Sequence, residues 1–191
     1  KKFKGKILDI GAGTGFISEV TDWDITGVDM SPEMCEISGA ICAEAENLPF
    51  EDESFDNIIS SLTFQWIQDD VTAAAEAYRV LKKGGEIAIS TFGKSTLLEL
   101  EDAFSYLDSN EHILDFPPSM KVFAAFKKAG FENLTIHSQN ITYLYDDIYS
   151  LLKSIKSIGA SYPIAGSKGL KGKKYFEQLG NIYHAKHNVC L

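Results

Sequence analysis

The sequence predicts an α/β fold with a mostly parallel central sheet and helices on both faces. Short apolar segments typical of strands alternate along the chain with longer segments typical of helices, which is the pattern of consecutive βαβ units. The chain has 191 residues, 45% of them hydrophobic, which suits one globular domain with a full-sized core. We therefore expect a single domain over residues 1–191.

The strands are expected at Lys6–Ile10, Ile25–Asp29, Ala40–Ala43, Asn57–Ser61, Glu86–Thr91 and Asn133–Tyr143. Ser31 and Pro32 predict a helix start, since serine caps a helix and proline suits its first position. Further helices are expected at Val71–Leu81, Lys94–Glu111, Phe116–Ala129, Asp146–Ile158 and Lys173–Tyr183. Ligands bind outside the carboxyl ends of the strands in such sheets, so we expect inserts at about 94–118 and 146–183 to form a helical lid.

Composition excludes several classes of protein. The net charge is −9 and the acidic residues concentrate before residue 146, which argues against a general nucleic-acid binder. The three cysteines, Cys35, Cys42 and Cys190, have no metal-ligand spacing and fit a reducing cytosol, so we expect no metal. With no signal peptide and no run of 18 apolar residues, we expect a cytoplasmic protein without membrane contact. Both ends look cut, which suggests a portion of a longer protein.

A glycine-rich turn follows the first expected strand. In Asp9-Ile10-Gly11-Ala12-Gly13-Thr14-Gly15, three glycines two residues apart allow a tight turn and a close approach of the backbone to a ligand. The dinucleotide fingerprint would need Gly or Ala at position 16, where this chain has Phe16. Asp29 ends the second expected strand, where a carboxylate can accept bonds from both hydroxyls of a ribose.

This order of motifs resembles the class I S-adenosylmethionine (SAM) methyltransferases, from about Lys6 to Thr91. The resemblance implies a Rossmann-like fold and SAM as the cofactor, with an acid after the third strand that binds the adenine amino group. The cofactor-binding residues that it implies are Asp9, Gly11, Gly13, Gly15, Asp29, Met30, Glu44, Ala45 and Ser60.

Later segments narrow the resemblance. Gln65-Trp66 after the fourth strand, His112, and Leu152–Ala160 with the following Gly169-Leu170 are similar to the malonyl-acyl-carrier-protein O-methyltransferases of biotin synthesis. This resemblance implies methyl transfer from SAM to the free carboxylate of a malonyl thioester, with Gln65, Trp66 and His112 at the substrate.

The implied partner is a malonyl-loaded acyl carrier protein, which is acidic. The lysines that could attract it are Lys153, Lys156, Lys171 and Lys173. Arginine often binds a substrate carboxylate, but the only arginine, Arg79, lies in the helix before Gly84-Gly85 and suggests a structural or surface role. The substrate carboxylate would then be bound by a lid lysine such as Lys153 or Lys156, by His112 itself, or by a donor from a missing N-terminal segment.

Other functions stay open at this stage. The chain could methylate another small molecule, such as a quinone precursor or a different carboxylic acid. It could also be a non-catalytic SAM-binding module that regulates a partner. A NAD-dependent enzyme is the most distant alternative, because of Phe16 and the lack of a proton-relay set.

Overall fold

The computed structural model describes residues 3–157 and 172–187. The chain forms two compact units, each built from two segments. Unit 1 comprises Lys1–Lys94 and Pro117–His137, and unit 2 comprises Ser95–Phe116 and Ser138–Leu191.

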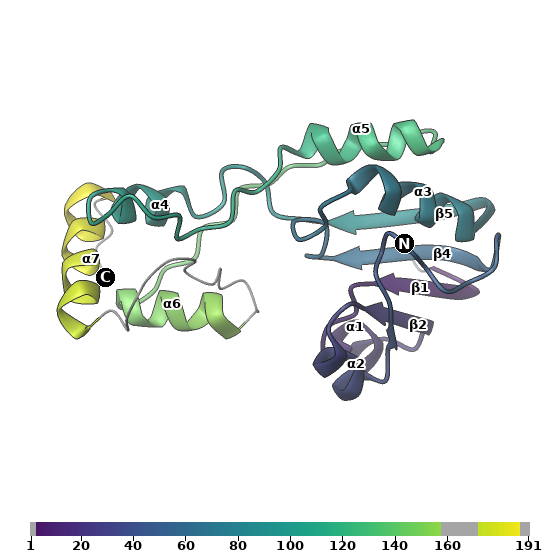
Figure 1. Ribbon diagram of the computed structural model, residues 1–191, viewed down its shortest axis with the longest axis horizontal. Coiled ribbons are helices and arrows are strands. Elements are labelled where there is room, and N and C mark those ends of the chain that lie inside the picture. The colour runs from purple at the N-terminus through teal and green to yellow at the C-terminus, as the bar shows by residue number, and fades with distance from the viewer. Residues whose placement is uncertain (1–2, 158–171, 188–191) are drawn as a thin grey trace. The chain divides into compact units, whose positions relative to one another are not determined.

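Unit 1 contains a five-stranded sheet in the order β3-β2-β1-β4-β5, in which every neighbouring pair is parallel (Figure 1). Its strands are β1 (Lys6–Ile10), β2 (Asp24–Asp29), β3 (Ile41–Cys42), β4 (Phe55–Ser61) and β5 (Leu81–Ser90). The chain runs outward from β1 to β3 and then returns to the other side of β1 as β4. The predicted α/β class and parallel sheet are confirmed.

Two helices of unit 1 begin at side chains that cap them. α2 (Pro32–Ser38) begins with the Ser31 hydroxyl accepting the Met34 N–H, as expected for a serine cap followed by proline. α3 (Asp70–Val80) is capped by Asp69, whose carboxylate accepts the N–H groups of Val71 and Thr72. The remaining helices are α1 (Phe16–Val20) and α5 (Ser119–Ala129).

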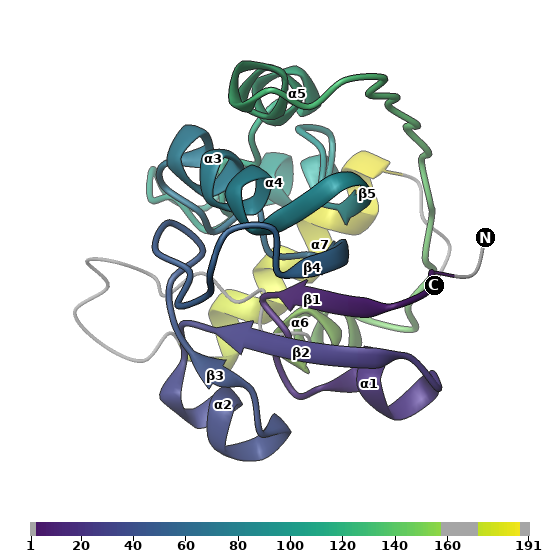
Figure 2. The same cartoon turned by 90° about the vertical axis from the view of Figure 1, so that its right-hand side faces the viewer.

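The main core lies between the sheet and helices α3 and α5. Apolar side chains of β1 and β4, such as Leu8 and Ile58, pack with Ala77 of α3 and Phe126 of α5, and all four are buried. Figure 2 shows α3 and α5 toward the β5 end of the sheet and α1 and α2 toward the β2–β3 end. Because β1, β2 and β4 pair in parallel, their carboxyl ends lie at the same edge of the sheet.

Unit 2 is helical in its described part. It contains α4 (Leu98–Ser105), α6 (Ile148–Ser157) and α7 (Lys173–His187), which share an apolar core of their own. Leu100, Leu151 and Leu179 supply one buried side chain from each helix. Among the residues described, no helix has the length and apolar character needed to cross a bilayer.

The strand predicted at Asn133–Tyr143 is wrong. No strand forms there, Asn133 has a positive φ of 54°, and the side chains of Ile141 and Tyr143 are 62% and 71% exposed. Their alternation with polar residues matches a strand pattern, but a strand needs a neighbour, and this segment has none in the described sheet. The helix predicted over Lys94–Glu111 is also shorter, at Leu98–Ser105.

Candidate functional site

The glycine turn lies at the point where the order of the sheet reverses. β1 and β4 are adjacent in space, although β2 and β3 come between them in the chain. In open parallel sheets, ligands bind in the crevice at the carboxyl ends of the strands at such a point. The loops that follow β1 and β4 meet here, since a Cβ placed on Gly11 would collide with the side chain of Thr63.

The three predicted glycines all adopt positive φ, at 75° for Gly11, 55° for Gly13 and 85° for Gly15. The space around the Cα atom differs among the three glycines. A Cβ on Gly15 would lie 3.1 Å from the Cβ of Ser38, whereas a Cβ on Gly13 would meet nothing within 4 Å. Gly13 therefore presents bare backbone to open space, as close approach to a ligand requires.

Asp29 joins the glycine turn to the start of α2. One carboxylate oxygen accepts the N–H of Gly13 at 2.8 Å, and the other accepts the N–H of Ser31 at 2.9 Å. Each carboxylate oxygen has a second lone pair, so both can still accept a hydroxyl proton. The predicted position of Asp29 at the end of β2 is correct, and its bond to Gly13 was not foreseen.

Asp9 is a buried carboxylate beside this turn, with 2% of its surface exposed. Its Oδ1 atom is buried and has no hydrogen-bond partner. Burial, with a smaller contribution from the charge of Asp29, raises the pKa of Asp9 to about 6. A cation in the site would offset the repulsion between Asp9 and Asp29, and a hydrogen-bond donor would satisfy the Oδ1 atom of Asp9.

The other predicted cofactor residues differ in exposure. Met30, directly after β2, is 68% exposed, and Glu44, two residues after the end of β3, is also exposed. Ala45 is half-buried and packs against the main core. Ser60 is buried, and its hydroxyl donates to the carbonyl of Ile10 at 2.8 Å, which ties β4 to β1 at the crevice. Direct binding of SAM by these residues stays a prediction.

Gln65 and Trp66 follow β4 within unit 1. The Gln65 amide is buried, donates to the Leu62 carbonyl at 2.6 Å and accepts the Thr91 hydroxyl at 3.0 Å. One amide N–H of Gln65 is outside these two bonds. Trp66 is 39% exposed, so it is not a fully packed core residue.

His112 belongs to unit 2 and is held in a polar cluster. Its Nε2 lies 2.6 Å from the Asp108 carboxylate and 3.3 Å from the Tyr175 hydroxyl, and Phe104 stacks on its ring. The Tyr175 hydroxyl also donates to Asp108 at 2.8 Å. The side chain of His112 is only 2% exposed and its Nδ1 has no partner. A substrate contact through His112 stays a prediction.

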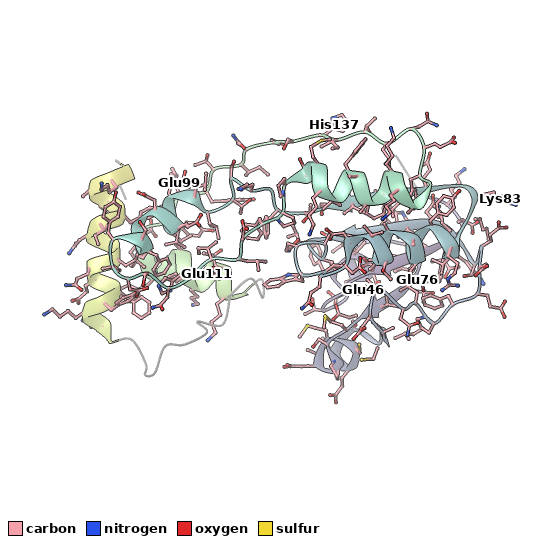
Figure 3. The ribbon with its side chains drawn as sticks, turned by 45° about the horizontal axis from the view of Figure 1, so that its top comes forward. Glu46, Glu76, Lys83, Glu99, Glu111 and His137 are labelled. Atoms are coloured by element: carbon pink, nitrogen blue, oxygen red, sulfur yellow. The ribbon has the colours of Figure 1, made fainter. Side chains whose placement is uncertain are left out.

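Arg79 has the structural role that the sequence suggested. Its guanidinium donates to Glu76 (labelled in Figure 3) and Asp52, and to the carbonyls of Leu48 and Phe50. The bonds to Glu76 and then Asp52 raise the pKa of Arg79, and the full set holds the connection between β3 and β4 against α3. Since its donors are used within unit 1, Arg79 is not the substrate-carboxylate ligand.

Two functional contributions were missed from sequence. Thr63 forms the wall that requires glycine at position 11, and the Ser31 N–H helps to orient Asp29. The helix-cap pattern at Ser31 could have indicated the second role, because the N–H of a capping residue lies near the preceding strand end. No cluster of three or more metal-ligating side chains occurs within residues 3–157 and 172–187.

Comparisons with known proteins agree with this geometry. Residues 8–89 match the family described as "Methyltransferase domain". A malonyl-[acyl-carrier protein] O-methyltransferase of Herminiimonas arsenicoxydans is 35% identical over 90% of this chain and 70% of that protein. The biotin biosynthesis bifunctional protein BioHC of Teredinibacter turnerae is 31% identical over 93% of this chain and 35% of that protein.

A solved structure from Thermotoga maritima, described as a SAM-dependent methyltransferase and possible histamine N-methyltransferase, is also similar. It is 31% identical, with a TM-score of 0.57 over 69% of this chain and 66% of that one.

The parallel sheet, the glycine turn and the acid at the end of β2 define a class I SAM-dependent methyltransferase. The bare backbone at Gly13, the lone pairs of Asp29 and the unpartnered oxygen of Asp9 fit a cofactor with ribose hydroxyls and positive charge. The chain belongs to the malonyl-[acyl-carrier protein] O-methyltransferase family.

Proposed function

We propose that this protein transfers a methyl group from SAM to the free carboxylate of a malonyl thioester on acyl carrier protein, in biotin precursor synthesis. The observation that carries the proposal is the similarity to relatives of that name, at 35% identity over nine-tenths of this chain. The BioHC relative supports the pathway. The proposed compartment is the cytoplasm, where the carrier protein and SAM would both be available.

SAM supplies an electrophilic methyl carbon on a sulfonium sulfur when it is bound. Asp29 and the Gly13 backbone are the groups that would hold its ribose, and Asp9 is the nearby negative charge. Glu44 and Met30, exposed after β3 and β2, would flank the adenine. Gly11 keeps the turn close to the loop after β4.

The residues of the chain need not remove a proton from this substrate. A malonyl carboxylate is already ionised at neutral pH, so a general base is unnecessary. The work of the site is to hold the reacting groups in line, which can lower a barrier by several kcal/mol, on the order of 7 or more in favourable systems. The half-exposed Trp66 ring and the remaining N–H of Gln65 are suited to orient a thioester substrate.

Unit 2 is proposed to supply the lid and the docking surface for the carrier protein. Lys153 and Lys156 lie one helical turn apart on α6 and are both exposed, and Lys173 at the start of α7 is 83% exposed. Exposed lysines would speed the encounter with an acidic carrier protein, and salt would weaken the effect. Lys171, which was predicted to contribute, lies outside the described residues.

The test is methyl transfer from labelled SAM to malonyl-acyl carrier protein, with acetyl-acyl carrier protein as the control that lacks the free carboxylate. Base-labile label on the malonyl form alone is the expected result. Equal labelling of free small acids, with no gain from the carrier protein, would favour another small-molecule methyltransferase. SAM binding without turnover on any carboxylate would favour a non-catalytic SAM-binding module.

A further inference from the structure

Two cysteines lie against the backbone of the residues that form the ribose end of the site. The Cys35 Sγ on α2 donates to the carbonyl oxygen of Asp29 at 3.2 Å. The Cys42 Sγ on β3 lies 3.9 Å from the carbonyl oxygen of Met30. The proposed function uses neither thiol.

The strand pairing brings the two thiols together. Cys42 is the register partner of Asp29 in the β2–β3 pair, and the N–H of the next residue, Ala43, donates to the same Asp29 oxygen that accepts the Cys35 thiol. The Cys35 sulfur is therefore fixed at the Cys42–Ala43 peptide. Burial, and then the neighbouring Cys42 thiol, raise the pKa of the Cys35 thiol.

The two thiols differ in access to solvent. Cys42 is exposed on β3, which is an edge strand of the described sheet, while Cys35 on α2 is half-buried. A small reagent therefore reaches Cys42 first, with Cys35 placed behind it. This arrangement resembles an attacking thiol with a second thiol in reserve.

We propose that Cys35 and Cys42 form a thiol-oxidation site that closes to an intramolecular disulfide with a low-molecular-weight disulfide such as oxidised glutathione. The Cys42 thiolate attacks the reagent, a mixed disulfide forms, and one glutathione thiol leaves. The Cys35 thiolate then attacks the Cys42 sulfur and displaces the second glutathione thiol. Two protein thiols are oxidised, and one glutathione disulfide is reduced to two thiols. Because the pKa of the Cys35 thiol is raised, little of it is thiolate near neutral pH, and this second step becomes faster as the pH rises.

Formation of the disulfide would disturb the proposed cofactor site through the main chain of Asp29. The disulfide removes the Cys35 S–H donor from the Asp29 carbonyl and draws α2 toward β3. The Asp29 carboxylate is attached through Ser31 to the start of α2 and through Gly13 to the glycine turn. A hydrogen bond from a ribose hydroxyl to the charged Asp29 carboxylate would contribute about 1.5 kcal/mol or more, which is a factor of about ten in affinity. If the disulfide displaces this carboxylate, SAM binding is expected to weaken about tenfold or more in the disulfide form. The expected effect of the disulfide on SAM binding rests on the proposed function.

The experiment uses the full chain with Cys190→Ser, so that two thiols remain. After treatment with oxidised glutathione and alkylation of free thiols, intact mass is expected to show loss of two hydrogens and no alkylation. Cys35→Ser should stop at a mixed disulfide on Cys42, and Cys42→Ser should react slowly at Cys35. Two independent mixed disulfides, a covalent dimer or two free thiols would overturn the proposal.

Calorimetry then measures SAM affinity of the reduced and oxidised forms, with Cys42→Ser treated in parallel as the variant that cannot close. A dissociation constant that rises about tenfold in the disulfide form alone is expected. An unchanged constant would overturn the coupling to the cofactor site. Failure of the reduced protein to bind SAM would refute the proposed function, while the mass result would still decide whether the disulfide forms.

Discussion

Replacement of Asp9 by asparagine should stabilise the protein at neutral pH while it weakens cofactor binding. Asp9 is almost fully buried, one of its oxygens has no partner, and its pKa is raised from 3.8 to about 6. At 1.36 kcal/mol per pKa unit, ionisation in the folded state costs about 3 kcal/mol at pH 7. An asparagine avoids this cost but leaves its own amide incompletely bonded, at a cost of about 1–2 kcal/mol, so we expect a net gain of about 1–2 kcal/mol.

The direction of the pH dependence follows from the raised pKa. Between pH of about 4 and 6 the folded state holds the Asp9 proton more tightly than the unfolded state does. The contribution of Asp9 to stability is therefore most favourable below this window, falls as the pH rises through it, and stays low above it. In Asp9→Asn this part of the slope should vanish.

Urea unfolding followed by the fluorescence of Trp23 and Trp66, both in unit 1, measures the effect from pH 4 to pH 8. Asp56→Asn is the matched control at the opposite ends of the strands. Its pKa is lowered, chiefly by a hydrogen bond from Lys82, so its loss should destabilise the protein at pH 7. Equal slopes for wild type and Asp9→Asn, or no gain at pH 7, would refute the reasoning.

Further variants test the described contacts. Gly11→Ala should lose about 2–4 kcal/mol of folding stability because its methyl group collides with Thr63, whereas Gly13→Ala should lose about 1 kcal/mol from left-handed strain alone. Gly13→Ala should nevertheless lose SAM affinity. Thermal unfolding measures the first effect and calorimetry the second, and normal SAM binding by Gly13→Ala would contradict the proposed site. Arg79→Lys should lose about 1–3 kcal/mol in urea unfolding, since an ammonium cannot reproduce the four-partner guanidinium contacts, and a wild-type midpoint would argue against this role. Tyr175→Phe should lose about 1 kcal/mol and speed hydrogen exchange in α4 and α7, because its hydroxyl bonds Asp108; unchanged exchange would show that this bond contributes nothing.

Local chemistry made much of unit 1 predictable from sequence. The strands β1, β2 and β4, the helices α3 and α5 and the start of α2 were placed within a few residues, since their caps and apolar runs are local signals. The segment 133–143 was not, because pairing of a strand depends on a neighbour that a local pattern does not contain. The same limit applies to the start of β5, which lies at Leu81 although the strand was expected only from Glu86. Gly85 pairs so closely with β4 that a Cβ there would lie 2.7 Å from the Asp56 carbonyl oxygen.

In the candidate site, too, local features could be predicted from sequence and long-range contacts could not. The glycines and Asp29 were identified from spacing, and the structure gives them the expected backbone and strand-end positions. The use of the Gln65 amide and the burial of His112 depend on partners far along the chain, Thr91 for one and Tyr175 for the other. Sequence spacing carries no information on such partners, so it could name these residues without showing what their polar atoms contact.

The placement of two carboxylates at the switch point favours a positively charged ligand over a neutral one. Asp9 and Asp29 come from adjacent parallel strands, β1 and β2, and the charge of Asp29 contributes to the raised pKa of Asp9. A protein under selection for stability alone would replace the buried Asp9, because its ionisation opposes folding at neutral pH. A sulfonium ligand reverses that balance, since it pairs with the charge that the fold itself does not neutralise. We therefore expect the same buried carboxylate to lower the stability of the protein and to give the proposed site its electrostatic preference for SAM.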